Sequence, residues 1–437
     1  MESFYNLVSI VKYDGTINSL KNAIEQCNGF SELKQNDKVL LKPNIVWSGG
    51  GTKKIPKYGL ITTSKIVEDI IQLLHQHGCR NISIGEGTIA DKEFSSDTFN
   101  GYKRYGFAKF TKKYGVKLID FNKEPYKQVE LNGTRIEISN AALEADFLIN
   151  LPVLKTHCQV KVSLGLKNLK GCLSMQSRKE FHEKDLERMI ALLNTQVKPK
   201  LTVIDGIYGL ERGPTSLGIA HRMNVIIAGR DSLSCDIVGS TVLGINPSSV
   251  EYLKEFALLT NRSLDINGID LRGEKIGNVT RKMEWEMNFE DIFRRANISG
   301  ISFKFPGKHY CTGCVCHTDA LMAAFCKDNM GGKFDNIEIC IGGEVTPRTD
   351  SKKVFLMGNC SIRANKELED AIRVKGCPPK VAAMFMALLN NTLDKQRVRK
   401  ISLGRLIKHI GNSVRIYDED FPIYPRYEPP EFDRRHF

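Results

Sequence analysis

The chain has 437 residues, and its 63 lysines and arginines outnumber its 50 aspartates and glutamates to give a formal net charge of +13. A chain of this length is too long for one ordinary hydrophobic core, so we expect at least two domains. The positive charge favours anionic partners. The sequence has no zinc finger, RNP-like aromatic strand or basic recognition helix, so a nucleic acid is not among the partners that we expect.

Membrane and secretion signals are also missing from the sequence. We find no window of about 18 apolar residues and no basic segment followed by an apolar stretch at the start. We therefore expect a soluble, cytoplasmic protein with no membrane partner. Because such a compartment keeps thiols reduced, the twelve cysteines should be available for metal binding, chemistry or packing rather than paired in disulfides.

The first 260 residues alternate short apolar runs with amphipathic segments, which predicts an α/β domain with a largely parallel sheet flanked by helices. The clearest helix is expected over residues 63–77, where Thr63 or Ser64 caps the start and Gly78 ends it. A second helix should follow Asp231 and end at Gly244. The expected strands are residues 5–11, 38–41, 81–84, 116–119, 146–151, 201–204 and 223–228.

The composition changes after residue 260. Residues 261–299 are polar and charged and predict a connector or an insertion made of turns and short strands. Residues 300–412 form a smaller cysteine-rich α+β module, and residues 413–437 mix proline, aromatic and charged residues in a way typical of an extended tail. Within the module we expect helices over 318–326, 366–374 and 379–389 and strands over 337–341 and 354–357.

Four cysteines in the module have the context of metal ligands. Cys311 and Cys314 flank a Thr-Gly pair, a spacing that lets both sulfurs point into one site. Cys360 stands in a Gly-Asn-Cys turn after an apolar strand, and Cys377 stands in Gly-Cys-Pro-Pro before a helix. Glycine allows a close backbone approach, and the Cys-Pro pair is similar to the end of bacterial ferredoxin motifs. The pattern predicts a metal centre.

A 4Fe-4S cluster and a zinc ion both accept four thiolates. Structural zinc sites usually have two paired Cys-x-x-Cys knuckles, whereas here Cys360 and Cys377 stand singly, 46 and 17 residues further along. The arrangement favours the iron–sulfur cluster, with zinc and a free redox thiol pair as alternatives. Of the remaining cysteines in the module, Cys316 is a possible substitute ligand, and the others have the apolar surroundings of buried residues.

A basic segment in the α/β domain is the candidate substrate site. If residues 151–171 form a strand, its alternation places lysines and a histidine on one face and apolar residues on the other. The segment follows an apolar run that ends at the edge where ligand crevices form in open α/β sheets. We interpret it as a pocket for a carboxylate or phosphate, and a solvated face is the alternative. The candidate residues are Lys155, His157, Lys161, Lys167, Asn168 and Lys170.

Three other turns follow strands and should collect at the same edge of the sheet. Lys42 and Asn44 follow the first of these strands, Glu86 follows the second, and Asp205 with Glu211 follows the third. We expect Lys42, Asn44 and Asp205 to contact the substrate, although a carboxylate after a strand is also a common helix cap. The chain contains neither a dinucleotide fingerprint nor a Walker loop.

The motifs KPNIV, INLPVLKTH, SLGLKNLKG, VIDGIYGLERGP and IAGRDSLSCDIVG occur in this order, and together they resemble the domain-of-unknown-function 362 family over about residues 8–250. Members of that family often carry an iron–sulfur module, and the CTGC, GNC and GCPP motifs here resemble a C-terminal version of it. The chain departs from the family in lacking the CxxCxxCxxxCP ferredoxin run. The resemblance implies fold and cluster and leaves the substrate open, since the reaction of the family is not settled.

These observations lead to one main hypothesis and two alternatives. The main hypothesis is a 4Fe-4S enzyme that acts on an anionic small molecule by redox or Lewis-acid chemistry. In it His157 is the general acid or base, and Lys155 and Lys167 stabilise negative charge. The first alternative is an electron-transfer or scaffold protein whose basic face docks a redox partner protein. The second is a zinc-stabilised binding module.

Overall fold

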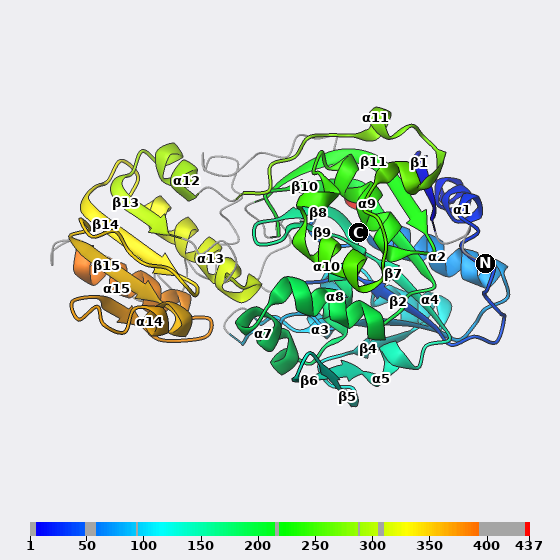
Figure 1. The fold of residues 1–437 in the computed structure, drawn as a ribbon, viewed down its shortest axis with the longest axis horizontal. Helices are drawn as coiled ribbons and strands as arrows, with labels where there is room; N and C mark the ends of the chain where they lie inside the picture. Colours follow the sequence, from blue (N-terminus) through cyan, green and yellow to red (C-terminus); the bar gives the residue numbers. More distant parts are fainter. Residues whose placement is uncertain are drawn as a thin grey trace.

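A computed structural model describes residues 6–48, 58–92, 95–214, 218–286, 289–304, 310–392 and 433–437. Within these ranges the chain forms a large α/β part and a smaller module, seen at the right and left of Figure 1. Each part is built around its own sheet.

The sheet of the α/β part has ten strands and is largely parallel, with antiparallel pairing of β11 to β1 and β10 and of β9 to β8. Its main path runs in the order β12-β1-β11-β10-β7-β2-β3-β4, and β8 with β9 continues from β10. The strands are β1 (Leu7–Lys12), β2 (Val39–Pro43), β3 (Ile82–Glu86), β4 (Lys117–Asp120), β7 (Phe147–Leu151), β8 (Val153–His157), β9 (Lys161–Ser163), β10 (Leu201–Glu211), β11 (Ile219–Gly229) and β12 (Asp270–Gly273).

Helices cover both faces of this sheet, because alternate residues of its strands belong to opposite apolar clusters. On β2, Val39 and Leu41 pack with α1 and α2, whereas Leu40 packs with α8, α9 and α10. A separate hairpin joins β5 (Tyr126–Leu131) to β6 (Thr134–Ser139). The helices are α1 (Ile17–Gln26), α2 (Ser64–Gln76), α3 (Thr98–Arg104), α4 (Lys109–Tyr114), α5 (Asn140–Leu143), α6 (Gly165–Asn168), α7 (Met175–Glu183), α8 (Leu186–Gln196), α9 (Ser232–Val242), α10 (Glu251–Leu259) and α11 (Ile276–Val279).

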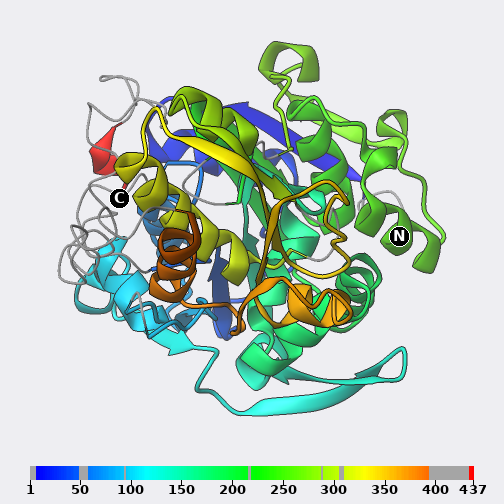
Figure 2. The ribbon, with the colours of Figure 1, turned by 90° about the vertical axis from the view of Figure 1, so that its left-hand side faces the viewer.

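The smaller module is a four-stranded parallel sheet in the order β13-β14-β15-β16. Helices α12, α13 and α15 pack on one face, and α14 lies against the other. Its elements are α12 (Phe289–Arg295), β13 (Ser299–Lys304), α13 (Thr312–Asp328), β14 (Lys333–Ile341), β15 (Lys353–Met357), α14 (Asn359–Ala364), β16 (Ile372–Val374) and α15 (Val381–Thr392). Figure 2 shows the module in front of the α/β part.

The predicted α/β class, with a large, mostly parallel sheet and a smaller C-terminal module, is confirmed. Two local expectations were wrong. Residues 366–374 form a turn and β16 instead of a helix, and the basic segment forms β8, β9 and α6 instead of one strand. The module's sheet is wholly parallel. β12, inside the expected connector, pairs with β1 in the large sheet.

The last described residues return to the α/β part. His436 is buried, and its ring lies 3.0 Å from the Tyr208 hydroxyl, while Phe437 packs edge-on against Tyr58. Residue 5 of the first expected strand and residues 413–432 of the expected tail lie outside the described residues. Within the described ranges, no helix has the length and apolar character needed to cross a membrane.

Candidate functional site

The carboxyl ends of strands from both sheets border one cavity of about 530 Å3. Strands β2, β3 and β8 bring one wall, and strands β14, β15 and β16 bring the other. Ligand sites in parallel α/β sheets occur at these strand ends. Here two sheets present that edge to the same space, so the site combines side chains from both parts of the protein.

All four cysteines predicted as ligands line this cavity. Cys311 and Cys314 lie at the start of α13, Cys360 lies in the first turn of α14 after β15, and Cys377 lies in the loop after β16. All twelve cysteines of the chain are free thiols. In the part of the chain that the structure describes, no three His, Cys, Asp or Glu side chains converge closely enough to hold a single metal ion.

Glycines and hydrogen bonds hold the loops of Cys360 and Cys377 together. Gly358 has φ +94° and Gly376 has φ +143°, which are conformations that side chains disfavour. A Cβ atom on Gly376 would lie 2.6 Å from the Cα atom of Pro379. The N–H of Asn359 donates to the Gly376 carbonyl at 2.9 Å, and the N–H of Gly376 donates to Asn359 Oδ1 at 2.9 Å. These two hydrogen bonds therefore hold the segments that carry Cys360 and Cys377 next to each other.

Polar groups suited to negative sulfur lie beside Cys311 and Cys360. A hydrogen bond between the Cys311 and Cys314 side chains, with help from the N–H groups of Gly313 and Cys314, lowers the pKa of Cys311 to about 6. The same side-chain contact raises the pKa of Cys314. Arg363 lies with Nη2 3.8 Å from the sulfur of Cys360. Backbone N–H groups and a cation near the sulfurs are features that stabilise thiolate ligands.

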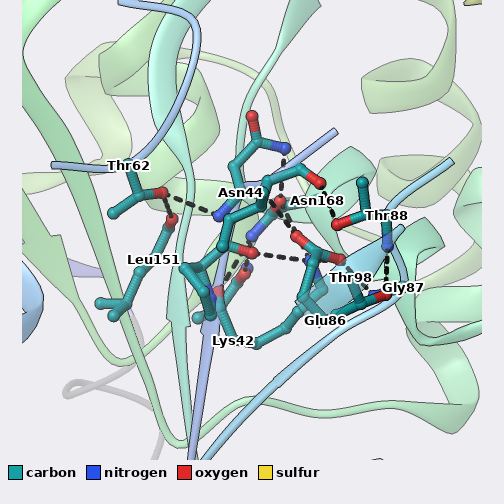
Figure 3. Close-up of polar contacts among 12 residues, drawn as sticks. Lys42, Asn44, Thr62, Glu86, Gly87, Thr88, Thr98, Leu151 and Asn168 are labelled. Atoms are coloured by element: carbon teal, nitrogen blue, oxygen red, sulfur yellow. Dashed lines mark hydrogen bonds and ion pairs between the residues drawn. The ribbon is translucent and has the colours of Figure 1, made fainter. Parts of the chain in front are cut away.

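A buried ion pair anchors the α/β wall. Lys42 Nζ lies 2.9 Å from Glu86 Oε1, and both side chains are almost completely buried. The carboxylate of Glu86 also accepts the N–H of Ile45 at 2.7 Å and the N–H of Gly87 at 2.8 Å, so its charge is well compensated. Asn168 accepts hydrogen bonds from Lys42 at 3.4 Å and from Asn44 at 3.0 Å, which ties α6 to the end of β2 (Figure 3).

Lys155, which lies on β8, is held by the same network. Its ammonium donates to Asn44 Oδ1 at 2.5 Å and to the carbonyl of Leu60 at 3.1 Å. Burial, with a smaller contribution from the neighbouring charge of Lys167, lowers the pKa of Lys155 to about 7. At neutral pH this lysine is therefore only partly charged, and an anion beside it would favour its charged form.

His157 lines the cavity with its ring in one defined tautomer. The N–H of Gln159 donates to His157 Nδ1 at 3.1 Å, so in the neutral ring the proton lies on Nε2. Burial and the charges of Lys167 and Lys155 hold the pKa of His157 well below its usual range, so the ring stays neutral. Within the described residues Nε2 has no hydrogen-bond partner. His157 is thus a neutral N–H donor in this structure, and its role as a general acid or base stays a prediction.

Lys167 lies on α6, a one-turn helix fixed by a buried carboxylate. Asp236 Oδ1 accepts the N–H of Gly165 at 2.6 Å, and its Oδ2 accepts the N–H of Leu166 at 2.9 Å. Burial raises the pKa of Asp236 to about 8, although these two N–H groups act against the increase. Burial lowers the pKa of Lys167 to about 8. Asp236 thereby sets the position from which Lys167 reaches the cavity.

Two predicted residues lie outside the cavity. Lys161 has φ +64° and directs its ammonium over the Trp285 ring at 5.5 Å. Asp205 lies within β10 and accepts the N–H of Thr63, the N-cap residue of α2, at 2.7 Å, so it supports the start of that helix without being its cap. The other predicted residues line the cavity together: Lys42, Asn44, Lys155, His157, Lys167, Asn168, Lys170 and the four cysteines.

Sequence reasoning missed several residues at this site. Arg178 and His182 on α7 line the cavity, and His182 Nε2 lies 2.5 Å from Lys170 Nζ. His317 on α13 joins the two walls through Asp91. Asp236 stands in the motif IAGRDSLSCDIVG, where a charged residue inside an apolar helix was the available signal. The residues on α7 gave no such signal, because their helix has an ordinary polar face.

The chain is 26% identical over 239 residues to "Thylakoid-associated protein sll1697" of Synechocystis sp. (strain ATCC 27184 / PCC 6803 / Kazusa), a match that covers 53% of this chain and 71% of that protein. A solved structure, the lactate racemase apoprotein from Thermoanaerobacterium thermosaccharolyticum, has 12% identity and a TM-score of 0.37, with 90% of this chain and 92% of that chain covered.

The expected family resemblance spanned about residues 8–250. Within that range, residues 39–241 match the family model described as "Domain of unknown function (DUF362)". This segment begins at β2 and ends in α9, so it contains Lys42, Lys155, His157 and Lys167 but none of the four cysteines of the module. The α/β part of the chain, with the lysine wall of the cavity, is therefore similar to the DUF362 family.

Proposed function

We propose that this protein binds a 4Fe-4S cluster through Cys311, Cys314, Cys360 and Cys377, opposite a pocket for an anionic small molecule. The observation that carries the proposal is that the four thiols and four of the five predicted lysines line one cavity, although they come from segments far apart in the chain. When bound, the cluster would supply electron transfer or Lewis-acid chemistry to a molecule in the pocket. The protein is then an enzyme with redox or Lewis-acid chemistry.

The arrangement of the thiols supports a cluster. The four sulfurs approach from three separate loops around a cavity, and the cluster is a larger group than a single ion. Backbone N–H groups near Cys311 and the guanidinium near Cys360 would donate to sulfur, which is how proteins adjust iron–sulfur centres. Cys316, the possible substitute ligand, does not line the cavity.

The charge of the walls supports an anionic ligand. Cationic side chains along the cavity outnumber carboxylates by seven to four, and Lys42 is already neutralised by Glu86. A cluster with four thiolates and an anionic substrate would both balance this excess. The cations are Lys42, Lys155, Lys167, Lys170, Arg178, Lys179 and Arg363, and the carboxylates are Glu86, Asp91, Glu183 and Glu344.

The chain's own residues have separate tasks in this proposal. Lys155 is positioned by Asn44 and supplies charge to the bound anion. His157 offers its Nε2–H to an oxygen of the substrate, and because the ring is neutral it stabilises a developing negative charge without giving up a proton. The twelve free thiols support the prediction of a reducing, cytoplasmic compartment.

Metal analysis tests the cluster. Protein purified without oxygen should contain about four irons and four sulfides per chain and show a broad absorption near 400 nm that dithionite bleaches. Cys360→Ser should lose this signal, whereas Cys340→Ala, on β14 of the same module and outside the cavity, should keep it. One zinc per chain and a colourless protein would contradict the iron–sulfur proposal. The zinc-stabilised binding module would then be the remaining hypothesis.

Anion binding is tested separately on the same protein. Inorganic phosphate and pyruvate should each raise the melting temperature at low salt, and the increase should be lost in Lys155→Met. Lys161→Met is the matched control, because Lys161 belongs to the same basic segment but lies outside the cavity. An equal increase in both variants would show that the anions bind elsewhere.

A further inference from the structure

We propose that the anion bound in this cavity carries an aldehyde or ketone group, and that the ε-amine of Lys167 forms an imine with its carbonyl carbon. The inference rests on the anion pocket proposed above and adds to it a substrate class and a nucleophile. It does not depend on whether the module binds iron or zinc.

The contacts of the cavity lysines single out Lys167. Each of the other four has a polar partner: Lys42 pairs with Glu86, Lys155 donates to Asn44, Lys170 contacts His182, and Lys179 lies 3.8 Å from Glu183. Lys167 alone has no hydrogen bond or ion pair within the described residues, and its side chain lines the cavity. A lysine without a partner is the one whose amine is available to a ligand.

Lys167 also lies at the centre of the cationic group. Its charge is the largest electrostatic cause of the lowered pKa of Lys155, of His157 and of Lys170. Burial lowers the pKa of Lys167 itself to about 8, so an appreciable fraction of its amine is neutral near pH 7.5. A desolvated amine that is partly neutral is the state in which lysine reacts with carbonyl carbons.

His157 supplies the complementary group. His157 lines the same cavity, and its Nε2–H has no partner in the described part of the chain. A carbonyl carbon near Lys167 needs a donor at its oxygen, because attack by the amine places negative charge there. The cavity therefore offers one unpaired nucleophile and one unpaired donor, and a carbonyl group uses both at once.

The reaction balances without an oxidant or a second substrate. The nitrogen of Lys167 forms a bond to the carbonyl carbon while the carbon–oxygen π bond breaks, and the oxygen receives the electron pair beside His157. The carbon–oxygen bond then breaks as the nitrogen–carbon double bond forms. The two amine protons leave with that oxygen as water. The anionic group of the substrate remains to contact Lys155 and Lys170.

Reductive trapping tests this assignment. The full-length protein is incubated with pyruvate or glyoxylate and sodium cyanoborohydride, and intact mass and peptide mapping locate the adduct. We expect one adduct per chain, at Lys167, from at least one of the two oxo acids. Lys167→Arg should lose it, and Lys161→Arg should retain it, since Lys161 lies outside the cavity. Circular dichroism checks that both variants fold.

Variants of His157 test the second half of the inference. His157→Phe removes the donor and should slow trapping about 100-fold, the usual cost of removing such a donor. His157→Gln keeps an amide N–H and should lose less. Equal rates in the two variants would overturn the role of His157.

The outcomes separate this inference from the proposed function. If pyruvate and glyoxylate raise the melting temperature but give no adduct at Lys167, the anion pocket stands and the imine is overturned. If neither the oxo acids nor phosphate bind, both the proposed anion pocket and the proposed imine are contradicted. Adducts spread over surface lysines, equally in Lys167→Arg, also overturn the imine. Iron content, measured on the same samples, reports on the cluster independently.

Discussion

His317 Nε2 lies 2.6 Å from a carboxylate oxygen of Asp91, and this contact joins the cysteine module to the α/β part at the edge of the cavity. The other ring nitrogen, Nδ1, lies 2.9 Å from the carbonyl of Pro379, two residues after Cys377. One buried imidazole thus connects the loop of a proposed ligand to the opposite wall. The His317 side chain can therefore hold the module in the orientation in which the four thiols and the lysines line one cavity.

The first prediction concerns this bridge. His317→Ala should lower the free energy of unfolding by about 1–3 kcal/mol, the cost of losing buried hydrogen bonds, and should speed the loss of iron to a chelator. The measurements are urea unfolding and the rate of iron release. His221→Ala removes a similar contact, with Glu211 at 2.7 Å, away from the cavity. Equal iron release from both variants would contradict the proposed role of His317.

The buried Lys42–Glu86 pair yields a second prediction. Lys42→Met should destabilise the protein by about 3–5 kcal/mol, because it leaves the carboxylate of Glu86 buried without its cation. The double variant Lys42→Met/Glu86→Gln should recover part of this loss. Urea unfolding of wild type, both single variants and the double variant measures the coupling. Additive losses would show that the pair is not coupled.

A third prediction concerns Asp236. Asp236→Asn places an amide beside two backbone N–H donors, where at most one oxygen can accept, and should cost about 1–3 kcal/mol. It should also lower the rate of adduct formation at Lys167, because α6 loses its anchor. Asp231→Asn is a useful control, since Asp231 caps α9 and lies away from the cavity. Unchanged trapping in Asp236→Asn would show that α6 does not need this carboxylate.

The fourth prediction is a dependence of stability on pH. Lys155 titrates near 10.5 in the unfolded chain and near 7 in the folded protein, so between these values the unfolded chain binds more protons. The free energy of unfolding should therefore rise with pH from about 7 upward, by on the order of 5 kcal/mol at full effect. Lys167, Lys42, Glu86 and His157 are the charged or titratable neighbours that shape this curve.

The measurement is urea unfolding from pH 6 to 9.5 in a buffer without phosphate, for wild type and Lys155→Met. The variant should have a shallower slope over this range. Its absolute stability is a poorer guide, because the substitution also leaves Asn44 and the carbonyl of Leu60 without their donor. Parallel curves would mean that Lys155 does not titrate as its burial implies.

The local pattern of the sequence predicted most of the strands and which face of β8 is polar. Lys155 and His157 are two residues apart on one strand, so alternation alone placed them together. Lys161 could not be placed correctly, because a positive φ at that residue ends the alternation. Lys167 reaches the cavity from a helix, so its inclusion was right although the predicted strand was wrong.

The meeting of the two sheets could not be predicted from local patterns. Periodicity identifies each strand and the turn that follows it, but not which distant turns share one cavity. Cys377 and Lys42 are separated by more than three hundred residues, and only the packing of the module on the α/β part brings them to one site. The identity of the bound group and the role of the cysteines also stay predictions. The spacing of the cysteines in the sequence does not specify which metal or cluster they bind.

The positions of Cys360 and Cys377 just after β15 and β16 affect how related chains should be recognised. A cysteine that follows a strand keeps its place when helices and loops between strands change in length, so the intervals of 46 and 17 residues between Cys314, Cys360 and Cys377 need not be shared by homologues. A search pattern that fixes these intervals would miss such homologues. A pattern that requires an apolar strand, then glycine, then cysteine within two residues, repeated twice after a CxxC pair, would find them.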